Sequence, residues 1–179
     1  TYCSGLDIFG ADNTWNHIFN ERTPQTIHLR GDTVHILWTR EGGGDRYNRS
    51  RNRGVTWDYC TGSDCGGIEV LSYSWESSIV VGGSKIHAVA YCWDCGGVSW
   101  VPYNRSRDGG TTWDYPTSGQ TIFHSSEIGY HLLDSPSMDV SLNGDTVLLV
   151  IDGYYSGIRV KRTFDGGNTW GPYGGILVA

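Results

Sequence analysis

Positive charge is scarce and scattered in this sequence, which holds 13 Lys and Arg against 19 Asp and Glu for a net charge of −6. No run of basic residues occurs, so nucleic acid, whose binding depends on clustered Lys and Arg, is not an expected partner. No apolar stretch approaches the roughly 20 residues that span a bilayer. No segment shows a sustained helical period, so helices are not expected to form the core.

Glycine and aromatic residues are abundant instead. The 179 residues include 26 Gly, 11 Tyr and 8 Trp but a single Met, and only 18% are charged. This composition suits many short strands joined by tight turns, and the length is enough for one domain with a core. The chain begins at Thr1 and shows no signal peptide, so we expect a mature or trimmed product.

Five cysteines are present, and four of them form two close pairs. The pairs are Cys60 with Cys65 and Cys92 with Cys95, each followed by Gly-Gly, while Cys3 stands apart. Close pairs of this kind favour loop disulfides in an exported protein. A metal site is the alternative, and it needs four thiolates gathered in one place. Cys3 is left to pair with one of the four or with another chain.

An internal repeat organises most of the chain. The sequence YNRSRNRGVTWDY recurs as YNRSRDGGTTWDY and again as VKRTFDGGNTWGPY. These copies begin at Tyr47, Tyr103 and Val160. An alternating apolar segment follows a glycine turn upstream of each copy, starting at Gly31, Gly83 and Gly144. Because the copies keep the same phase, each repeat is expected to form one supersecondary unit.

Each unit is predicted to contain four antiparallel strands. In the first unit the predicted strands are Thr26–Arg30, Thr33–Thr39, Tyr47–Ser50 and a strand from Trp57 onward. A turn at Gly31-Asp32 joins the first two strands, and a loop over Glu41–Asp45 precedes the third. Four strands in about 55 residues are typical of one propeller blade. The predicted blades are 22–74, 75–133 and 134–179, and residues 1–21 would supply a strand that completes a neighbouring blade.

Each unit also contains a turn of the pattern Ser-x-Asp-x-Gly-x-Thr-Trp. The Asp carboxylate can accept backbone N–H bonds inside the turn, the Gly supplies a positive φ, and the Trp packs the hairpin on its neighbour. The turn is therefore a structural staple rather than a catalytic motif. We call the three segments the box turns; their pattern residues are Ser50, Asn52, Gly54, Thr56 and Trp57, then Ser106, Asp108, Gly110, Thr112 and Trp113, then Thr163, Asp165, Gly167, Thr169 and Trp170.

The box turns resemble the Asp-box, or BNR repeat, of sialidases and related β-propellers. The second copy matches fully, the third has Thr163 in place of Ser, and the first has Asn52 in place of Asp. The resemblance implies an all-β fold of three four-stranded antiparallel blades. Three blades are fewer than the roughly 4–8 that close a propeller. Closure then requires two chains in one ring, head-to-tail stacking into a filament, or further blades from a longer parent chain.

Residues near the first unit also resemble a catalytic pattern of the same family. Sialidases carry an Arg-Ile-Pro motif whose Arg grips a substrate carboxylate, then a second Arg and an Asp that acts as acid/base. Arg22-Thr-Pro24, Arg40 and Asp45 follow that order here. Thr23 replaces the apolar residue, and the blades that supply the tyrosine nucleophile are absent.

Sugar binding without catalysis needs only aromatic and polar loops. Three loops between strands carry such residues, over Glu41–Tyr47, Tyr91–Trp100 and Asp152–Ser156. The candidate carbohydrate-binding residues are Trp93, Trp100, Tyr154 and Tyr155.

Local patterns also suggest N-glycosylation and calcium binding. Asn48-Arg-Ser50 and Asn104-Arg-Ser106 are N-glycosylation sequons at the same repeat position. Asp45, Asp94 and Asp152 lie in loops and offer carboxylates to a calcium ion, although their spacing resembles no dedicated calcium loop. No other cofactor is predicted.

The sequence thus predicts an extracellular or cell-surface propeller module that recognises carbohydrate or takes part in extracellular assembly, without catalysis. Its expected partners are glycans, and copies of itself or further blades. One alternative is a sialidase-type glycoside hydrolase, or its N-terminal half, that uses Arg22, Arg40 and Asp45. A second alternative is a self-assembling filament or surface protein.

Overall fold

Antiparallel strands in three separate sheets make up the computed structural model, which describes residues 26–39, 44–60, 66–72, 74–92, 95, 98–128, 136–153 and 157–178. The first sheet contains β1 (Thr26–Arg30), β2 (Thr33–Thr39), β3 (Asp45–Ser50) and β4 (Ile68–Leu71). The second contains β5 (Glu76–Gly82), β6 (Lys85–Tyr91), β7 (Trp100–Ser106) and β8 (Gln120–His124), followed by the short α1 (Ser125–Ile128). The third contains β9 (Ser137–Val140), β10 (Val147–Gly153), β11 (Gly157–Thr163) and β12 (Gly171–Leu177). The prediction of an all-β, antiparallel fold is confirmed.

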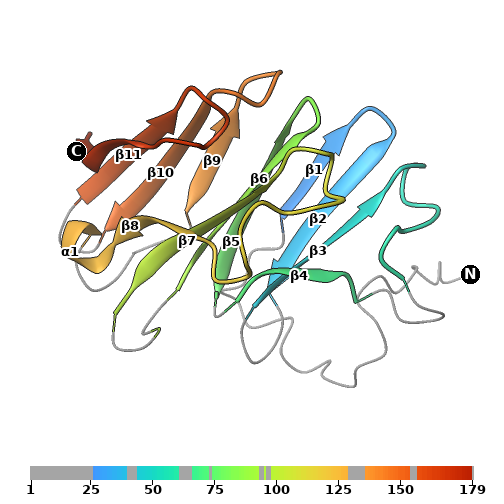
Figure 1. The fold of residues 1–179 in the computed structure, drawn as a ribbon, viewed down its shortest axis with the longest axis horizontal. Helices are drawn as coiled ribbons and strands as arrows, with labels where there is room; N and C mark the ends of the chain where they lie inside the picture. The colour runs from blue at the N-terminus through green and yellow to red at the C-terminus, as the bar shows by residue number, and fades with distance from the viewer. Residues whose placement is uncertain are drawn as a thin grey trace, which may run out of the picture.

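The three sheets stand side by side in chain order (Figure 1). Their first strands contact one another, β1 with β5 and β5 with β9. Within each sheet the strands pair in sequence order, and among the described residues no strand pairing joins one sheet to the next. Each box turn lies beside the first hairpin turn of its own sheet, as the hydrogen bond from Gly109 N to Ser84 O shows. We call this edge of the three sheets the turn end and the opposite edge the loop end.

The apolar core lies between the sheets. Because side chains alternate along β6, Ile86, Ala88 and Ala90 pack toward the first sheet while Val89 packs toward the third. All four are fully buried. The second sheet is thus covered on both faces, which explains why its central strand is almost entirely apolar.

A tyrosine on the third strand of one sheet packs beneath the box turn of the next. Tyr47 lies against the turn glycine Gly110, and Tyr103 lies in the same way against Gly167. The Trp113 ring meets Tyr47 edge-on at 5.1 Å between centroids, an arrangement that aromatic pairs favour. The next interface repeats this geometry, with Trp170 and Tyr103 at 5.1 Å. The repeat in the sequence therefore becomes a repeated mode of sheet packing.

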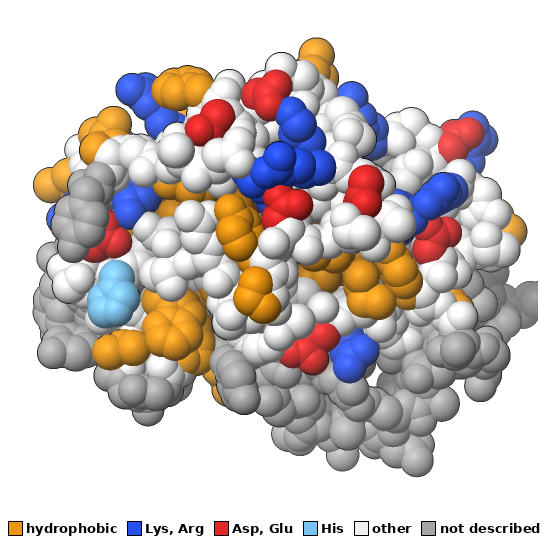
Figure 2. Space-filling model, in the orientation of Figure 1, with side chains coloured by type: hydrophobic (Ala, Val, Ile, Leu, Met, Phe, Trp, Pro, Cys, Tyr) orange, Lys and Arg blue, Asp and Glu red, His pale blue; other side chains and the backbone are white. Residues whose placement is uncertain are grey.

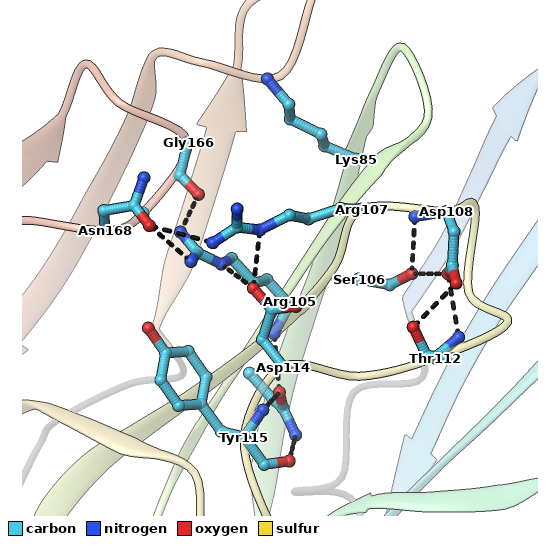
Figure 3. A network of polar contacts seen from close by, with 12 residues as sticks. Lys85, Arg105, Ser106, Arg107, Asp108, Thr112, Asp114, Tyr115, Gly166 and Asn168 are labelled. Atoms are coloured by element: carbon cyan, nitrogen blue, oxygen red, sulfur yellow. Dashed lines mark hydrogen bonds and ion pairs between the residues drawn. The ribbon is translucent and has the colours of Figure 1, made fainter.

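An arginine beside each tyrosine ties the same interface together. Arg105 Nε donates to Asp114 of its own sheet at 2.6 Å, while its terminal N–H groups donate to Gly166 O at 2.5 Å and to Asn168 Oδ1 at 2.7 Å in the third sheet (Figure 3). Arg49 bonds Asp58 and Gly109 O in the equivalent way. A guanidinium that donates from each of its three nitrogens can be buried at a reduced cost.

The box turns have the hydrogen bonds that their pattern predicts. Asp108 Oδ1 accepts the backbone N–H of Thr112 at 2.9 Å and Oδ2 accepts the Thr112 hydroxyl at 2.7 Å. Although slight burial opposes the shift, bonds from Thr112, Ser106 and Thr111 lower the pKa of Asp108 to about 2. In the first turn Asn52 Oδ1 accepts Thr56 N at 2.8 Å and Nδ2 donates to the Thr56 hydroxyl at 2.9 Å. The amide thus reproduces the carboxylate geometry without its charge.

Asn52→Asp should therefore stabilise the protein by about 0.5–1 kcal/mol, because hydrogen bonds to a charged acceptor are stronger than those to a neutral one. Urea unfolding at pH 7 measures the change. Asp108→Asn is the matched reverse substitution in the second turn and should destabilise by a similar amount. A variant Asn52→Asp that unfolds at lower urea than the parent would contradict this interpretation.

The structure corrects one strand prediction. The fourth strand of the first sheet begins at Ile68 rather than at Trp57. The segment after the box turn is instead held by Asn48, whose Oδ1 accepts Tyr59 N at 3.1 Å and whose Nδ2 donates to Tyr59 O at 3.3 Å. These side-chain bonds replace a strand ladder over the residues that follow Trp57.

Candidate functional site

Two of the described candidate residues, Asp45 and Trp100, lie at the loop end, each at the start of the third strand of its sheet. Asp45 begins β3 and is fully buried. The repeat alignment that matches Tyr47 with Tyr103 and Val160 places Val101 and Ile158 at the position of Asp45. A carboxyl group thus stands where the other two sheets have an apolar residue. Burial of such a group is costly unless something pairs with it.

The pairing of Asp45 within the described residues is incomplete. The Thr39 hydroxyl donates to Asp45 Oδ1 at 2.7 Å and lies 3.1 Å from the Trp75 carbonyl oxygen. Asp45 Oδ2 accepts no hydrogen bond from any described residue. The buried hydroxyls of Ser74 and Ser77 make none in the described part of the chain either. The two hydroxyls therefore lie close enough to Asp45 to lower its pKa, yet their hydrogen bonds with Oδ2 are incomplete in this buried region.

Burial raises the pKa of the Asp45 carboxyl to about 6, while the nearby hydroxyls of Ser74, Thr39 and Ser77 oppose the shift. A carboxyl with this pKa exchanges its proton close to neutral pH. It can accept hydrogen bonds from ligand hydroxyls when ionised, and it can donate a proton when neutral. Functional sites commonly contain perturbed carboxyls of this kind.

Two aromatic side chains flank this end of the sheets. Trp75 precedes β5 and is 49% exposed, and its backbone N–H donates to Tyr91 O at 2.9 Å. Trp100 begins β7 and is half-buried, and it forms a bridge with Cys92 through two backbone hydrogen bonds. Exposed indole faces at loop edges suit stacking on flat apolar surfaces, including the faces of sugar rings.

A disulfide braces the same end, which confirms the disulfide prediction for one pair. Cys92 and Cys95 are bonded to each other, and Cys60 is disulfide-bonded as well. Thiols engaged in disulfides cannot serve as metal ligands, so the alternative of a cysteine metal site is wrong for these residues. No group of three His, Cys, Asp or Glu side chains within the described ranges could hold a metal ion. Asp94, one of the calcium candidates, lies outside those ranges.

Most of the remaining candidates also fall outside the described residues. This holds for the proposed substrate-gripping arginines and for most of the aromatic candidates: Arg22, Arg40, Trp93, Tyr154 and Tyr155. Cys65 is likewise outside. The structure therefore brings Asp45 and Trp100 to one end of the molecule and leaves the other candidates as predictions.

The glycosylation candidates are contradicted by burial. Asn48 is 0% and Asn104 1% exposed. The Asn104 amide nitrogen donates to Val70 O at 2.8 Å and to Tyr115 O at 3.0 Å, so both of its protons are used inside the fold. A glycan on either nitrogen cannot coexist with these bonds. In the first two copies the Asn is used in packing and the Ser in the box turn, which accounts for both sequons.

Sequence reasoning missed Trp75, Ser74 and Ser77. These residues lie before and at the start of β5, in the connection between two sheets, whereas the predicted binding loops lie inside the repeat units. The one available signal was Trp75 itself, an aromatic residue that is not part of the repeat pattern.

No protein-family model matches the chain, and no curated protein matches it. The catalytic domain of a GH62 α-L-arabinofuranosidase from Coprinopsis cinerea aligns over 89% of this chain and 53% of its own length, with 11% identity and a TM-score of 0.47. An endo-arabinase from Bacteroides thetaiotaomicron aligns over 90% and 59%, with 11% identity and a TM-score of 0.47. The chain thus spans less than two thirds of either solved structure. Within the described residues no helix has the length and hydrophobicity needed to cross a bilayer.

Proposed function

We propose that the three sheets are blades of an Asp-box β-propeller and that the loop end binds carbohydrate in an extracellular setting. The internal repeat, the contacts among β1, β5 and β9, and the tyrosine packing beneath each following box turn support the blade assignment. The disulfides support an exported protein. The observation that carries the binding proposal is Asp45, a buried carboxyl with one unsatisfied oxygen in place of an apolar repeat residue.

The proposed binding mode combines polar and aromatic contacts. Asp45, Ser74 and Ser77 are buried, so sugar hydroxyls would bond them only after the residues that cover them move aside. The exposed Trp75 ring would stack on the sugar face. Such a site is small, and its specificity would come from a few placed polar groups.

Trp75→Ala should weaken glycan binding by about tenfold or more, as expected when an anchoring aromatic contact is lost. A glycan array identifies the ligand, and titration calorimetry measures its affinity. Phe164→Ala is the matched control because Phe164 is 64% exposed at the turn end, away from the proposed site. If both substitutions weaken binding equally, or if neither does, the loop end is not the binding site.

A second candidate function is glycoside hydrolysis, favoured by the pKa of Asp45 near 6, which suits a proton donor. In this case Arg22 and Arg40 would grip an acidic substrate and Asp45 would exchange a proton with the glycosidic bond. Release of a reporter from a sialoside tests it. Asp45→Asn should abolish turnover and keep binding if Asp45 is the acid/base, whereas it should weaken binding in a non-catalytic site.

Assembly through the third sheet is a further candidate, supported by exposed apolar residues on its outer face. Leu148 stands at the repeat position of His35 and His87 and is 43% exposed, and Ile176 is 44% exposed. The corresponding faces of the first two sheets are covered by the next sheet. Another copy or a further blade would cover this face, and analytical ultracentrifugation distinguishes an assembling chain from a strict monomer.

A further inference from the structure

A cavity of about 400 Å³ opens between the first two sheets at the turn end. Three arginines from the first sheet line it, Arg30, Arg49 and Arg51, together with His35. The second sheet contributes the hairpin turn at Gly83 and the box turn at Asp108 and Gly109. Since Arg49 and Asp45 lie near opposite ends of β3, this cavity is separate from the loop-end site.

The cavity exists because one repeat position differs. Between the second and third sheets the equivalent space is closed, since Gly82 packs directly on Gly144 and a Cβ there would overlap that backbone. Gly82 corresponds to Arg30 in the first sheet. A full side chain at this position keeps the Gly83 turn away from the first sheet. The Arg30 guanidinium instead reaches past the turn and donates to Leu142 O at 3.2 Å.

The change also leaves a buried histidine nitrogen without a partner among the described residues. In the closed interface His87 bonds the Tyr103 hydroxyl through Nδ1 and Gly144 O through Nε2, at 2.6 and 3.0 Å. His35 keeps the first bond, from Nδ1 to the Tyr47 hydroxyl at 2.8 Å. Its Nε2 has no hydrogen bond within the described residues, although the side chain is 3% exposed and lines the cavity. The Gly144 carbonyl fixes the His87 tautomer with the proton on Nε2, and the same tautomer of His35 would place a proton on the Nε2 that lines the cavity, although the Tyr47 hydroxyl also lies 3.5 Å from Gly109 O.

Arg51 loses a partner in the same way. Its repeat equivalent Arg107 donates to Asn168 Oδ1 at 3.0 Å across the closed interface (Figure 3). Thr111 stands at the position of Asn168 in the second sheet and makes no such bond. Arg51 keeps only its Nε contact with Asp58 at 3.0 Å. Arg51 also lines the cavity, and its terminal N–H groups have no hydrogen-bond partner among the described residues.

The carboxylates near the cavity do not use up these donors. Asp58 is shared between Arg49 and Arg51. Asp108 turns its carboxylate into its own box turn, where it accepts bonds from Ser106, Thr111 and Thr112. Charged side chains of both signs gather at the turn end on the face shown in Figure 2. The guanidinium groups of Arg30 and Arg51 and the His35 imidazole therefore line a space that holds few free acceptors, whereas Arg49 is already bonded to Asp58 and Gly109 O.

We propose that this cavity binds an oxyanion, either the carboxylate of an acidic saccharide or a free inorganic anion. A planar guanidinium donates two parallel hydrogen bonds to a carboxylate or sulfate, which makes Arg30 and Arg51 the principal ligands. His35 Nε2 would supply a further, buried donor. The cavity is large enough for a charged monosaccharide, since ligand sites typically measure about 300–1,000 Å³. The proposal does not depend on the loop-end site.

Titration calorimetry at constant ionic strength tests the proposal with sodium glucuronate, sodium sulfate and uncharged methyl glucoside. We expect saturable binding of glucuronate or sulfate and none of methyl glucoside. If glucuronate binds and sulfate does not, the cavity is an acidic-saccharide site. If sulfate binds equally well, the cavity is a general anion site. Absence of saturable binding by both anions overturns the proposal.

Arg51→Ala should weaken anion binding by about tenfold, the usual consequence of losing charge-assisted hydrogen bonds. Arg107→Ala is the matched control because it removes the repeat-equivalent arginine from the closed interface. Arg30→Gly introduces the residue that the second sheet has at the equivalent position, Gly82, and should abolish binding. Both Arg30 and Arg51 are exposed enough to be replaced without unfolding the protein. Equal loss in Arg51→Ala and Arg107→Ala, or full retention in Arg30→Gly, would contradict the assignment.

Discussion

Alanine at Gly110 or Gly167 should destabilise the protein by about 3 kcal/mol, whereas alanine at Gly54 should cost only about 1 kcal/mol. The three glycines occupy the same box-turn position with φ of 94°, 84° and 87°. Backbone strain from a Cβ is therefore equal at all three sites. An added Cβ at Gly110 would overlap the Tyr47 ring and one at Gly167 the Tyr103 ring, but at Gly54 the nearest atom is 3.9 Å away in Trp57.

Guanidinium unfolding of the three variants measures the difference directly. Gly54→Ala serves as the matched control for strain, so the excess of about 2 kcal/mol in the other two variants reports the packing of one sheet on the next. Substituting Tyr103 by Leu in the Gly167→Ala background should recover part of the loss, since the residues in contact are coupled. Equal destabilisation at the three positions would show that the tyrosines do not pack beneath the box turns.

Asp45→Asn should stabilise the protein above pH 6 by about 3 kcal/mol and change little near pH 4. Burial raises the pKa of Asp45 from 3.8 to about 6 in the folded state. Between pH 3.8 and about 6 the folded protein holds a proton that the unfolded chain has released, so the free energy of unfolding falls as the pH rises. Above pH 6 the buried carboxylate is charged and its full cost remains, which the neutral amide avoids.

Two histidines titrate in the same range with the opposite sign. Burial lowers the pKa of His35 and of His87 from 6.5 to about 4. Their stabilisation is complete above pH 6.5 and is lost as the pH falls through 4. Because both histidines are present in the parent and in Asp45→Asn, the difference between the two proteins isolates Asp45. Urea unfolding between pH 4 and 8 gives this difference, and a value that is flat with pH or larger at pH 4 would contradict the buried carboxyl.

The repeat, the strands β1 and β2 and the box turns could be predicted because local patterns determine them. Alternating side chains fix a strand within a few residues, and a turn carboxylate bonds the backbone N–H groups next to it. The bounds of β1 and β2 match the predicted segments Thr26–Arg30 and Thr33–Thr39. The fourth strand of the first sheet could not be located because Asn48 competes for the backbone at Tyr59.

The site features that escaped prediction depend on contacts between sheets. Asn48 and Asn104 carry a perfect sequon, and only the fold shows that both are buried. The significance of Arg30 is invisible in the sequence until Gly82 is seen packed on Gly144. Asp45 was selected through a family resemblance, but its unsatisfied oxygen and the neighbouring Trp75 depend on how β5 packs beside β2.

The binding of glycans at the loop end is the central claim, and a glycan array probed with the parent protein, Trp75→Ala and Phe164→Ala tests it most directly. The proposed site predicts that the parent and Phe164→Ala bind the same glycans and that Trp75→Ala loses them. Failure of the parent to bind any glycan, or an unchanged pattern with Trp75→Ala, would contradict it.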